Sequence, residues 1–241
     1  MERDGGQAAS SERFLAAYRA IETVLRRRVD TSAYVGFRAL VHEAARKEPA
    51  VRRYEIDLRQ YGDLRNAIVH EDRGGEPIAE PHLNVVDDLE RIAALLSDPP
   101  KIGAHFAKPV VTAAADQRVG LAARTMYDGR FSQLPVYASE GFLGLLTAET
   151  VMRWVAAHLT DDVGLLEEQP VADVLRYAED PENHVFMSRD KTIFEALEAF
   201  ERFSRDGKSL DAIIVTHSGR QSESPLGIVT IFDFPRLLDL T

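Results

Sequence analysis

Three side chains able to handle a proton and a negative charge lie within LRNAIVH, residues 64–70. Arg65 could stabilise the charge of a phosphate, and His70, with an ordinary pKa near neutrality, could act as a general base or acid. On an ideal helix Asn66 and His70 share one face, whereas Arg65 lies roughly 140° around the axis from His70. A single copy of the segment therefore presents the three groups awkwardly for joint catalysis.

The same residues also have a purely structural interpretation. His70 comes near the end of its helix, where an imidazole can interact with exposed carbonyl groups and with the negative end of the helix dipole. Arg65 could pair with surface carboxylates such as those of Asp57 or Glu71. The segment is either a catalytic cluster or the ordinary surface and end of a helix.

Apolar residues recur at helical spacing through the first hundred residues, which predicts the amphipathic helices that must position this segment. The polar loop EDRGGEPIAEP, residues 71–81, ends the helix that holds LRNAIVH. Short connections favour an up-and-down four-helix bundle. The four apolar stripes are Phe14, Tyr18, Ile21 and Leu25; Tyr34, Phe37, Val41 and Ala44; Val51, Tyr54, Leu58, Tyr61, Leu64 and Ile68; and Leu83, Val86, Leu89, Ile92 and Leu96.

The composition is globular and excludes several kinds of chemistry. The 241 residues are 45% hydrophobic and 28% charged and include no cysteine, which rules out disulfides, thiolate catalysis and cysteine zinc sites among them. No apolar run approaches the ~20 residues of a membrane span, and the N-terminus lacks the apolar stretch of a signal peptide. We therefore expect a soluble, cytoplasmic protein. The net charge of −10 argues against a protein that simply coats nucleic acid.

The second half of the chain contains two copies of one pattern. The offset between the copies grows along the chain, which places insertions near FSRDGKS and in SGRQSESP, both expected to be loops. Three pairs of segments align: ADQRVGLAARTM (115–126) with RDKTIFEALEAF (189–200), offset by 74; LPVYA (134–138) with IIVTH (213–217), offset by 79; and GLLTAETVMR (144–153) with GIVTIFDFPR (227–236), offset by 83.

Each copy is predicted to be a β-α-β-β-α unit. In the first copy the strands are expected at 109–112, 134–137 and 142–146, with helices at 117–127 and from Ala148 onward. The complete set of predicted segments is a disordered tail at 1–10, a helical bundle at 11–97, a linker at 98–109, a first repeat at 110–160 and a second repeat at 161–241.

The repeat resembles a tandem pair of CBS (cystathionine-β-synthase-type) domains. The resemblance is carried by FSQLPVYASEGFLGLLTAETV and LDAIIVTHSGRQSESPLGIVTIFDF, and most specifically by the ending Gly-x-x-Thr-x-x-Asp at Gly227, Thr230 and Asp233. It implies two clefts that often bind adenine nucleotides, with the Asp on the ribose hydroxyls and the Thr near ribose and phosphate. By the same motif, Val185 and its neighbouring backbone would flank the adenine.

The chemistry of these residues fits the roles that the resemblance implies. A carboxylate can accept both hydrogen bonds of a ribose diol, and a Thr at the start of a helix lies where backbone N–H groups favour phosphate. Arg236 could add a fixed positive charge. The alternative is that Thr230 and Asp233 form only a helix capping box, which requires no ligand.

The first copy departs from the family pattern. Thr147 is retained, but Thr150 stands where the ribose-binding Asp should be, and the adjacent Glu149 would point about 100° away around a helix. We expect one good nucleotide site around Thr230 and Asp233, and one degenerate or empty site around Thr147.

The N-terminal bundle with Arg65-Asn66-x-x-x-His70 resembles the HEPN superfamily of small helical bundles, several of which are metal-independent ribonucleases. The signature of that family is Arg, four to six residues and then His, often with a polar residue after the Arg. The resemblance covers residues 11–96 and implies that Arg65, Asn66 and His70 are catalytic. It also implies a composite site where two bundles meet, so that activity would require a twofold-symmetric homodimer.

Together, the two resemblances predict a regulatory protein whose CBS pair binds AMP, ADP or ATP and controls a HEPN-like endoribonuclease acting on RNA. Such control requires that the ligand bind two arrangements of the dimer with different affinities. Two other functions remain: a non-catalytic, nucleotide-responsive module that dimerises or binds a partner, and a structural dimer with empty clefts. No metal and no membrane partner are expected.

Overall fold

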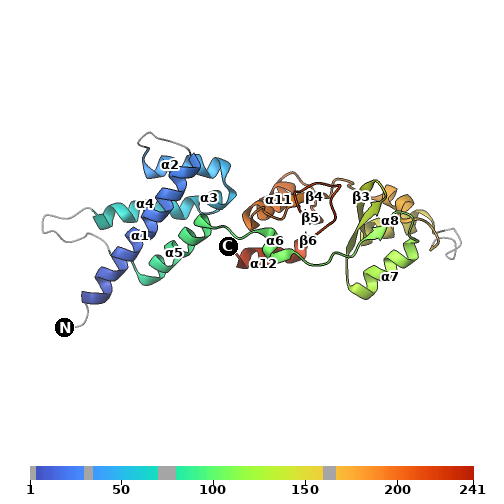
Figure 1. Ribbon diagram of the computed structural model, residues 1–241, viewed down its shortest axis with the longest axis horizontal. Coiled ribbons are helices and arrows are strands. Elements are labelled where there is room, and N and C mark those ends of the chain that lie inside the picture. The colour runs from blue at the N-terminus through green and yellow to red at the C-terminus, as the bar shows by residue number, and fades with distance from the viewer. Residues whose placement is uncertain (1–3, 30–34, 70–79, 160–166) are drawn as a thin grey trace. The chain divides into compact units, whose positions relative to one another are not determined.

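The structure of the protein, a computed structural model, describes residues 4–29, 35–69, 80–159 and 167–241. A helical N-terminal region is followed by an α/β region with small sheets (Figure 1). The chain divides into two compact units, which are described separately. Unit 1 holds Met1–Pro100, Thr192–Glu198 and Thr241, and unit 2 holds Lys101–Lys191 and Ala199–Leu240.

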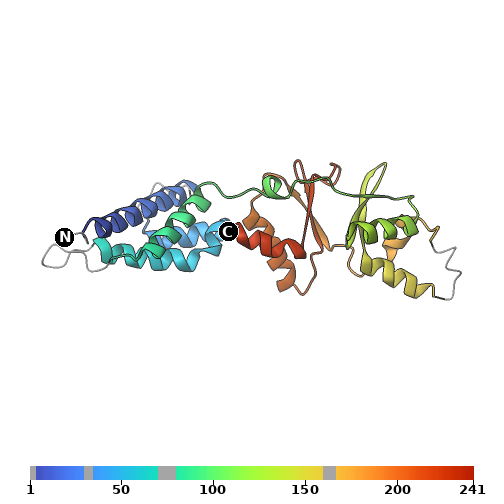
Figure 2. The same ribbon diagram turned by 90° about the horizontal axis from the view of Figure 1, so that it is seen from below.

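Five helices of unit 1 lie between residues 4 and 97 of the described chain. The long helix α1 lies beside α5 (Figure 2). The third predicted helix is divided at Tyr54 into two helices. The five helices are α1 (Asp4–Val29), α2 (Phe37–Lys47), α3 (Pro49–Arg53), α4 (Glu55–Val69) and α5 (Leu83–Ser97).

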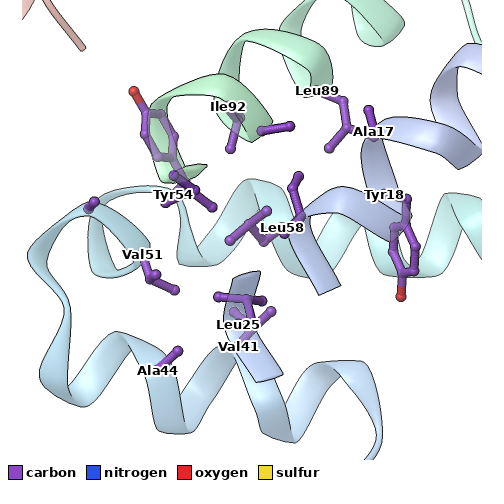
Figure 3. Close-up of a cluster of buried hydrophobic side chains, with 14 of the residues drawn as sticks. Ala17, Tyr18, Leu25, Val41, Ala44, Val51, Tyr54, Leu58, Leu89 and Ile92 are labelled. Atoms are coloured by element: carbon purple, nitrogen blue, oxygen red, sulfur yellow. The ribbon is translucent and has the colours of Figure 1, made fainter. Parts of the chain in front are cut away.

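The predicted apolar stripes meet in one core in unit 1. Leu25, Val41, Leu58 and Ile92 come from four different helices and point toward one another (Figure 3). All four are fully buried, as expected for the inner faces of amphipathic helices. Leu83, which begins α5, is 59% exposed. Three further stripe residues are only partly buried: Phe37, Tyr61 and Leu64.

The structure corrects two expectations about how the chain is organised. The segment 1–10, expected as a disordered tail, is helical from Asp4 onward. The segment 98–109, expected as a linker, contains the short helix α6 (Ile102–Phe106) and a β-bridge from Ala107 to Gly227. Proline and small residues in this segment therefore accompany an ordered connection within unit 2.

Unit 2 contains two three-stranded sheets with the same topology. In each sheet the first strand pairs parallel with the second, and the second pairs antiparallel with the third. Ala113 pairs with Val136 and Met187 with Val215, which reproduces the sequence offsets of 74 and 79. The strands are β1 (Ala113–Ala114), β2 (Gln133–Ala138), β3 (Gly141–Thr147), β4 (His184–Ser188), β5 (Ala212–Thr216) and β6 (Gly227–Thr230).

The strand predicted at 109–112 is wrong, because β1 covers only Ala113–Ala114. Trp154 packs in the core of the first sheet. The remaining helices that the structure describes are α7 (Val119–Gly129), α8 (Ala148–Ala157), α10 (Val171–Val174), α11 (Ile193–Arg205) and α12 (Phe234–Asp239), with 3-10 turns at Leu175–Tyr177 and Ile231–Asp233.

Across the described ranges, no helix combines the length and the apolar character needed to cross a membrane.

A close backbone approach joins the start of the first copy to the second sheet. The Lys108 N–H donates to the carbonyl of Leu226 at 2.9 Å, and Ala107 forms a bridge with Gly227. A Cβ at position 227 would lie 2.3 Å from the carbonyl oxygen of Phe106, so only glycine allows this approach. In Figure 1, α6 accordingly lies beside β6.

Gly227→Ala is expected to destabilise the protein by about 1–3 kcal/mol, because the added methyl group must displace backbone atoms. The matched control is Gly144→Ala at the equivalent position of the first copy. A Cβ there would lie 3.3 Å from the tip of the Leu175 side chain, which can move. Urea unfolding measures both changes, and equal destabilisation by the two variants would contradict the importance of the approach at Gly227.

Candidate functional site

A cavity of about 370 Å³ in unit 2 is built from both copies of the repeat. The second copy contributes the residues of its motif, including Thr230, Phe232 and Asp233, and the first copy contributes segments 108–111 and 130–135. The volume lies within the range of small-molecule sites, roughly 300–1,000 Å³. The wall combines apolar side chains with one carboxylate and two cationic groups.

Thr230 and Asp233 form a capping box at the start of the turn that leads into α12. The Asp233 Oδ2 atom accepts hydrogen bonds from the Thr230 N–H at 2.9 Å and from the Thr230 hydroxyl at 3.2 Å. Both of these bonds end on Oδ2, so the other carboxylate oxygen remains an acceptor for a ligand hydroxyl. The structural interpretation of the motif is therefore present, and it is compatible with a ligand-binding role.

The opening segment in the cavity, residues 108–111, comes from the first copy, whereas Val185 of the second copy was predicted there. Val185 lies in β4 and pairs with Ile213, and it is not among the residues that line this cavity. Val111 lines the cavity instead, and an offset of 74 makes Val111 the counterpart of Val185. The cavity thus combines the motif of one copy with the opening segment of the other.

Two cationic side chains that the sequence analysis did not single out, those of Lys108 and Arg130, line this cavity. Arg130 ends α7 with φ 54° and ψ 40°, the left-handed conformation that normally favours glycine. From the sequence alone, the preceding Gly129 would be predicted to adopt this conformation. Strained backbone of this kind gathers at functional positions.

Arg236 is engaged away from the cavity. Its guanidinium donates to the carbonyl of His105 at 2.7 Å and lies 4.6 Å from the centre of the Phe106 ring. These contacts hold α6, the helix that precedes Lys108. The proposed phosphate contact of Arg236 is therefore replaced, in this arrangement, by a role in positioning the opening segment.

The equivalent threonines of the first copy are buried and bonded to each other. The Thr147 and Thr150 hydroxyl oxygens are 2.9 Å apart, and the Thr150 N–H donates to the Thr147 hydroxyl at 3.0 Å. Thr150 is only 3% exposed. The pair forms a satisfied helix cap with no carboxylate, which is consistent with the expectation of a degenerate site there.

Aromatic side chains pack together on the opening strand of the second copy. The ring of Phe142 lies 4.8 Å from that of His184 and 4.9 Å from that of Phe186, measured between centroids. Burial lowers the pKa of His184 below its ordinary value, which favours the neutral ring. The three rings thus form an aromatic cluster that joins β3 of the first copy to β4 of the second.

In unit 1 the structure places Arg65 and Asn66 side by side on α4. The Arg65 guanidinium donates to the amide oxygen of Asn66 at 3.3 Å and lies 5.8 Å from the centre of the Tyr18 ring. Both residues line a second cavity. His70, the third member of the predicted cluster, lies outside the described residues. In the part of the chain that the structure describes, no group of three His, Cys, Asp or Glu side chains is placed to hold a metal.

Comparison with known proteins connects the first copy with a family. The CBS domain family model matches residues 102–157. This range begins at α6, includes the opening segment with Lys108 and Val111, and ends with α8. No curated protein matches the chain.

Three solved structures illustrate what the chain is similar to. A CBS-domain containing protein from Agrobacterium tumefaciens is 23% identical, with 54% of this chain and 85% of that chain covered and a TM-score of 0.40. A CBS domain pair in complex with 5′-methylthioadenosine and S-adenosyl-L-methionine is 15% identical, with coverages of 58% and 97% and a TM-score of 0.42. The protein CBSX2 in complex with AMP is 13% identical, with coverages of 58% and 96% and a TM-score of 0.42.

Proposed function

We propose that unit 2 binds an adenine nucleotide as a regulatory ligand in the cavity lined by Thr230 and Asp233. One observation carries this proposal: a single cavity combines a carboxylate, apolar side chains and the cationic groups of Lys108 and Arg130. The match of residues 102–157 to the CBS domain family supports it, because that range supplies one wall of the cavity.

Each part of a nucleotide has a complementary group in this cavity. The unbonded oxygen of Asp233 would accept from the ribose hydroxyls, and Val111 and Ile228 offer an apolar wall to the base. Lys108 and Arg130 would neutralise the phosphates, which a guanidinium binds well through its fork of N–H donors. The two cationic groups favour a phosphorylated adenosine over adenosine itself.

Asp233→Asn is expected to reduce the thermal stabilisation that adenine nucleotides give the wild-type protein. Asparagine retains an oxygen that can cap the Thr230 N–H, but its amide group donates where the ribose diol needs an acceptor. We expect affinity to fall roughly tenfold to a hundredfold. Melting curves with AMP, ADP and ATP measure this, and ligand at about 100 times its dissociation constant should stabilise wild type by roughly 2.7 kcal/mol.

Asp239→Asn is the matched control, because Asp239 is exposed at the end of α12 and does not line the cavity. It should leave the nucleotide response intact. An equal response in wild type and Asp233→Asn would contradict the assignment of Asp233 to the ribose. No response of wild type to any of the three nucleotides would leave unit 2 a structural module with empty clefts.

Arg130→Gly is expected to weaken ATP binding roughly tenfold while leaving adenosine binding unchanged. Glycine adopts the left-handed conformation without strain, so stability should stay constant or rise by up to about 1 kcal/mol. Lys108→Ala should weaken ATP binding in the same selective manner. Calorimetric titration with adenosine and ATP separates the two contributions, and an equal loss for both ligands would refute the assignment of these cations to phosphate.

A second function, metal-independent RNA cleavage by unit 1, is favoured by the adjacent placement of Arg65 and Asn66 in a cavity wall that holds three further arginines. In this proposal His70 transfers the proton and Arg65 stabilises the phosphorane charge. Two copies of unit 1 related by twofold symmetry would together supply the catalytic groups that one helix presents awkwardly.

His70→Ala is expected to reduce RNA cleavage by roughly a hundredfold or more, with little change in melting temperature. The control is His82→Ala, since His82 is exposed before α5 and makes no side-chain cap. Cleavage of a fluorescent single-stranded RNA, with a chelator present throughout, measures both variants. Cleavage that survives in His70→Ala would instead favour a non-catalytic module that only dimerises or binds a partner.

The homodimer is proposed together with these functions. Exposed apolar side chains on the helices of the first copy support it: Leu121 is 58% exposed, Tyr127 77% and Met152 66%. Regulation then follows if the nucleotide binds two arrangements of the dimer with different affinities, because only such a difference shifts their populations.

A further inference from the structure

A second cavity, of about 470 Å³, lies within unit 1 between α1, the start of α2 and α4. Four arginines line it: Arg26 from α1, Arg38 from α2, and Arg59 and Arg65 from α4. They come from separate turns of three helices, so the tertiary packing of the helices brings them together. The unit 2 cavity that Thr230 and Asp233 line shares no residue with this one.

The charges in the wall are unequal. Glu22 and Asp63 are the carboxylates in the lining, so four guanidinium groups face two carboxylates and the wall carries a net charge of +2. Arg26 pairs with Glu22 at 2.6 Å and Arg38 with Asp63 at 3.0 Å. Arg59 pairs with Glu55, a carboxylate that does not line the cavity.

Arg65 differs from the other three arginines. Among the ion pairs of the described residues none includes Arg65, which donates to the neutral amide of Asn66 and lies over the Tyr18 ring. Neither contact neutralises its charge. The ring and the amide nevertheless fix the position of the guanidinium, which lowers the entropy cost of binding an anion.

The cavity also has an apolar aromatic wall. The rings of Tyr18 and Phe37 pack at a centroid distance of 4.4 Å with an interplanar angle of 35°. Gly62 lies against this pair, and a Cβ there would come within 3.1 Å of the Phe37 ring. The cavity wall therefore places an aromatic surface next to fixed positive charge.

We propose that this cavity binds a small phosphomonoester, of the size of a nucleoside 5′-monophosphate, with its phosphate on Arg65 and Arg59 and its ring against Phe37. A phosphomonoester carries roughly −1.5 to −2 at neutral pH, which matches the net charge of the wall better than a single carboxylate does. The exposed ion pair of Arg38 with Asp63 contributes little to stability and can exchange for phosphate.

The volume favours a small molecule over an RNA chain. About 470 Å³ accommodates one nucleotide-sized ligand, and each phosphodiester of a chain carries only one negative charge. This inference goes beyond the function proposed for unit 2, and it requires no cleavage by unit 1. Binding of a monoester and cleavage of RNA are measured with different substrates, so the failure of one is distinguishable from the failure of the other.

The test is calorimetric titration of the full chain, carrying Asp233→Asn to silence the cavity of unit 2, with cytidine 5′-monophosphate. Cytidine and inorganic phosphate are titrated alongside. We expect the monophosphate to bind, cytidine not to bind, and inorganic phosphate to bind more weakly because it lacks the aromatic contact. Binding should weaken as salt is raised, because the charges are partly exposed.

Arg65→Gln should reduce the affinity for the monophosphate roughly tenfold or more, and Arg65→Lys should restore part of it. Arg59→Gln provides an independent loss of charge should Arg65→Gln fail to fold. Arg19→Gln is the control, since Arg19 is an exposed arginine of α1 that does not line the cavity.

Three results would overturn the proposal. The first is equal binding of cytidine and its monophosphate, which would leave the charge without a role. The second is a monophosphate affinity unchanged by both Arg65→Gln and Arg59→Gln. The third is binding of a short single-stranded RNA without a terminal phosphate in the absence of any monophosphate binding, which would assign the arginines to an RNA chain.

Discussion

The absence of a Cβ at Gly227 is the constraint on which the cavity of unit 2 depends. The carbonyl of Phe106 occupies the space that any other side chain would need, and this allows Lys108 to bond to Leu226 before the chain reaches β1. The opening segment of the first copy consequently lies against the motif of the second. Arg236 strengthens the same approach by binding the carbonyl of His105 and the ring of Phe106. Arg236, which was expected to contact the ligand, thus holds the segment that supplies Lys108.

The two copies of the motif show why one side chain can separate a binding site from a structural cap. In the second copy the cap uses one oxygen of the Asp233 carboxylate, and the other oxygen remains. In the first copy Thr150 has a single side-chain oxygen, which is already bonded to Thr147 in a buried position. Both copies satisfy the first turn of their helix. The capacity to bind a ribose depends on the acceptor that is left after the cap is complete.

Periodicity predicted the elements, because burial of one face is a local property of the sequence. The stripes through Phe14 and Leu89 are buried as expected, and the strands around Val136 and Ile213 lie where alternation and the repeat placed them. The exchange of opening segments between the copies could not be predicted this way, because it depends on a long-range backbone approach. Gly227 indicated a close backbone approach, but a glycine in a strand does not show which segment approaches it. Lys108 and Arg130 were missed for the same reason, and Arg130 also adopts a conformation that favoured Gly129.

The net charge of −10 and the positive cavities are compatible because electrostatic forces in salt solution are local. At physiological ionic strength the Debye length is about 8 Å, so a small anion inside a cavity responds mainly to the groups in its wall. A long polyanion also extends beyond the wall and is exposed to the net negative charge of the rest of the protein. In both cavities the important cation is fixed by the fold, Arg130 through its left-handed backbone and Arg65 through the Tyr18 ring. Fixed cations of this kind suit the small, highly charged ligands that are proposed for the two cavities.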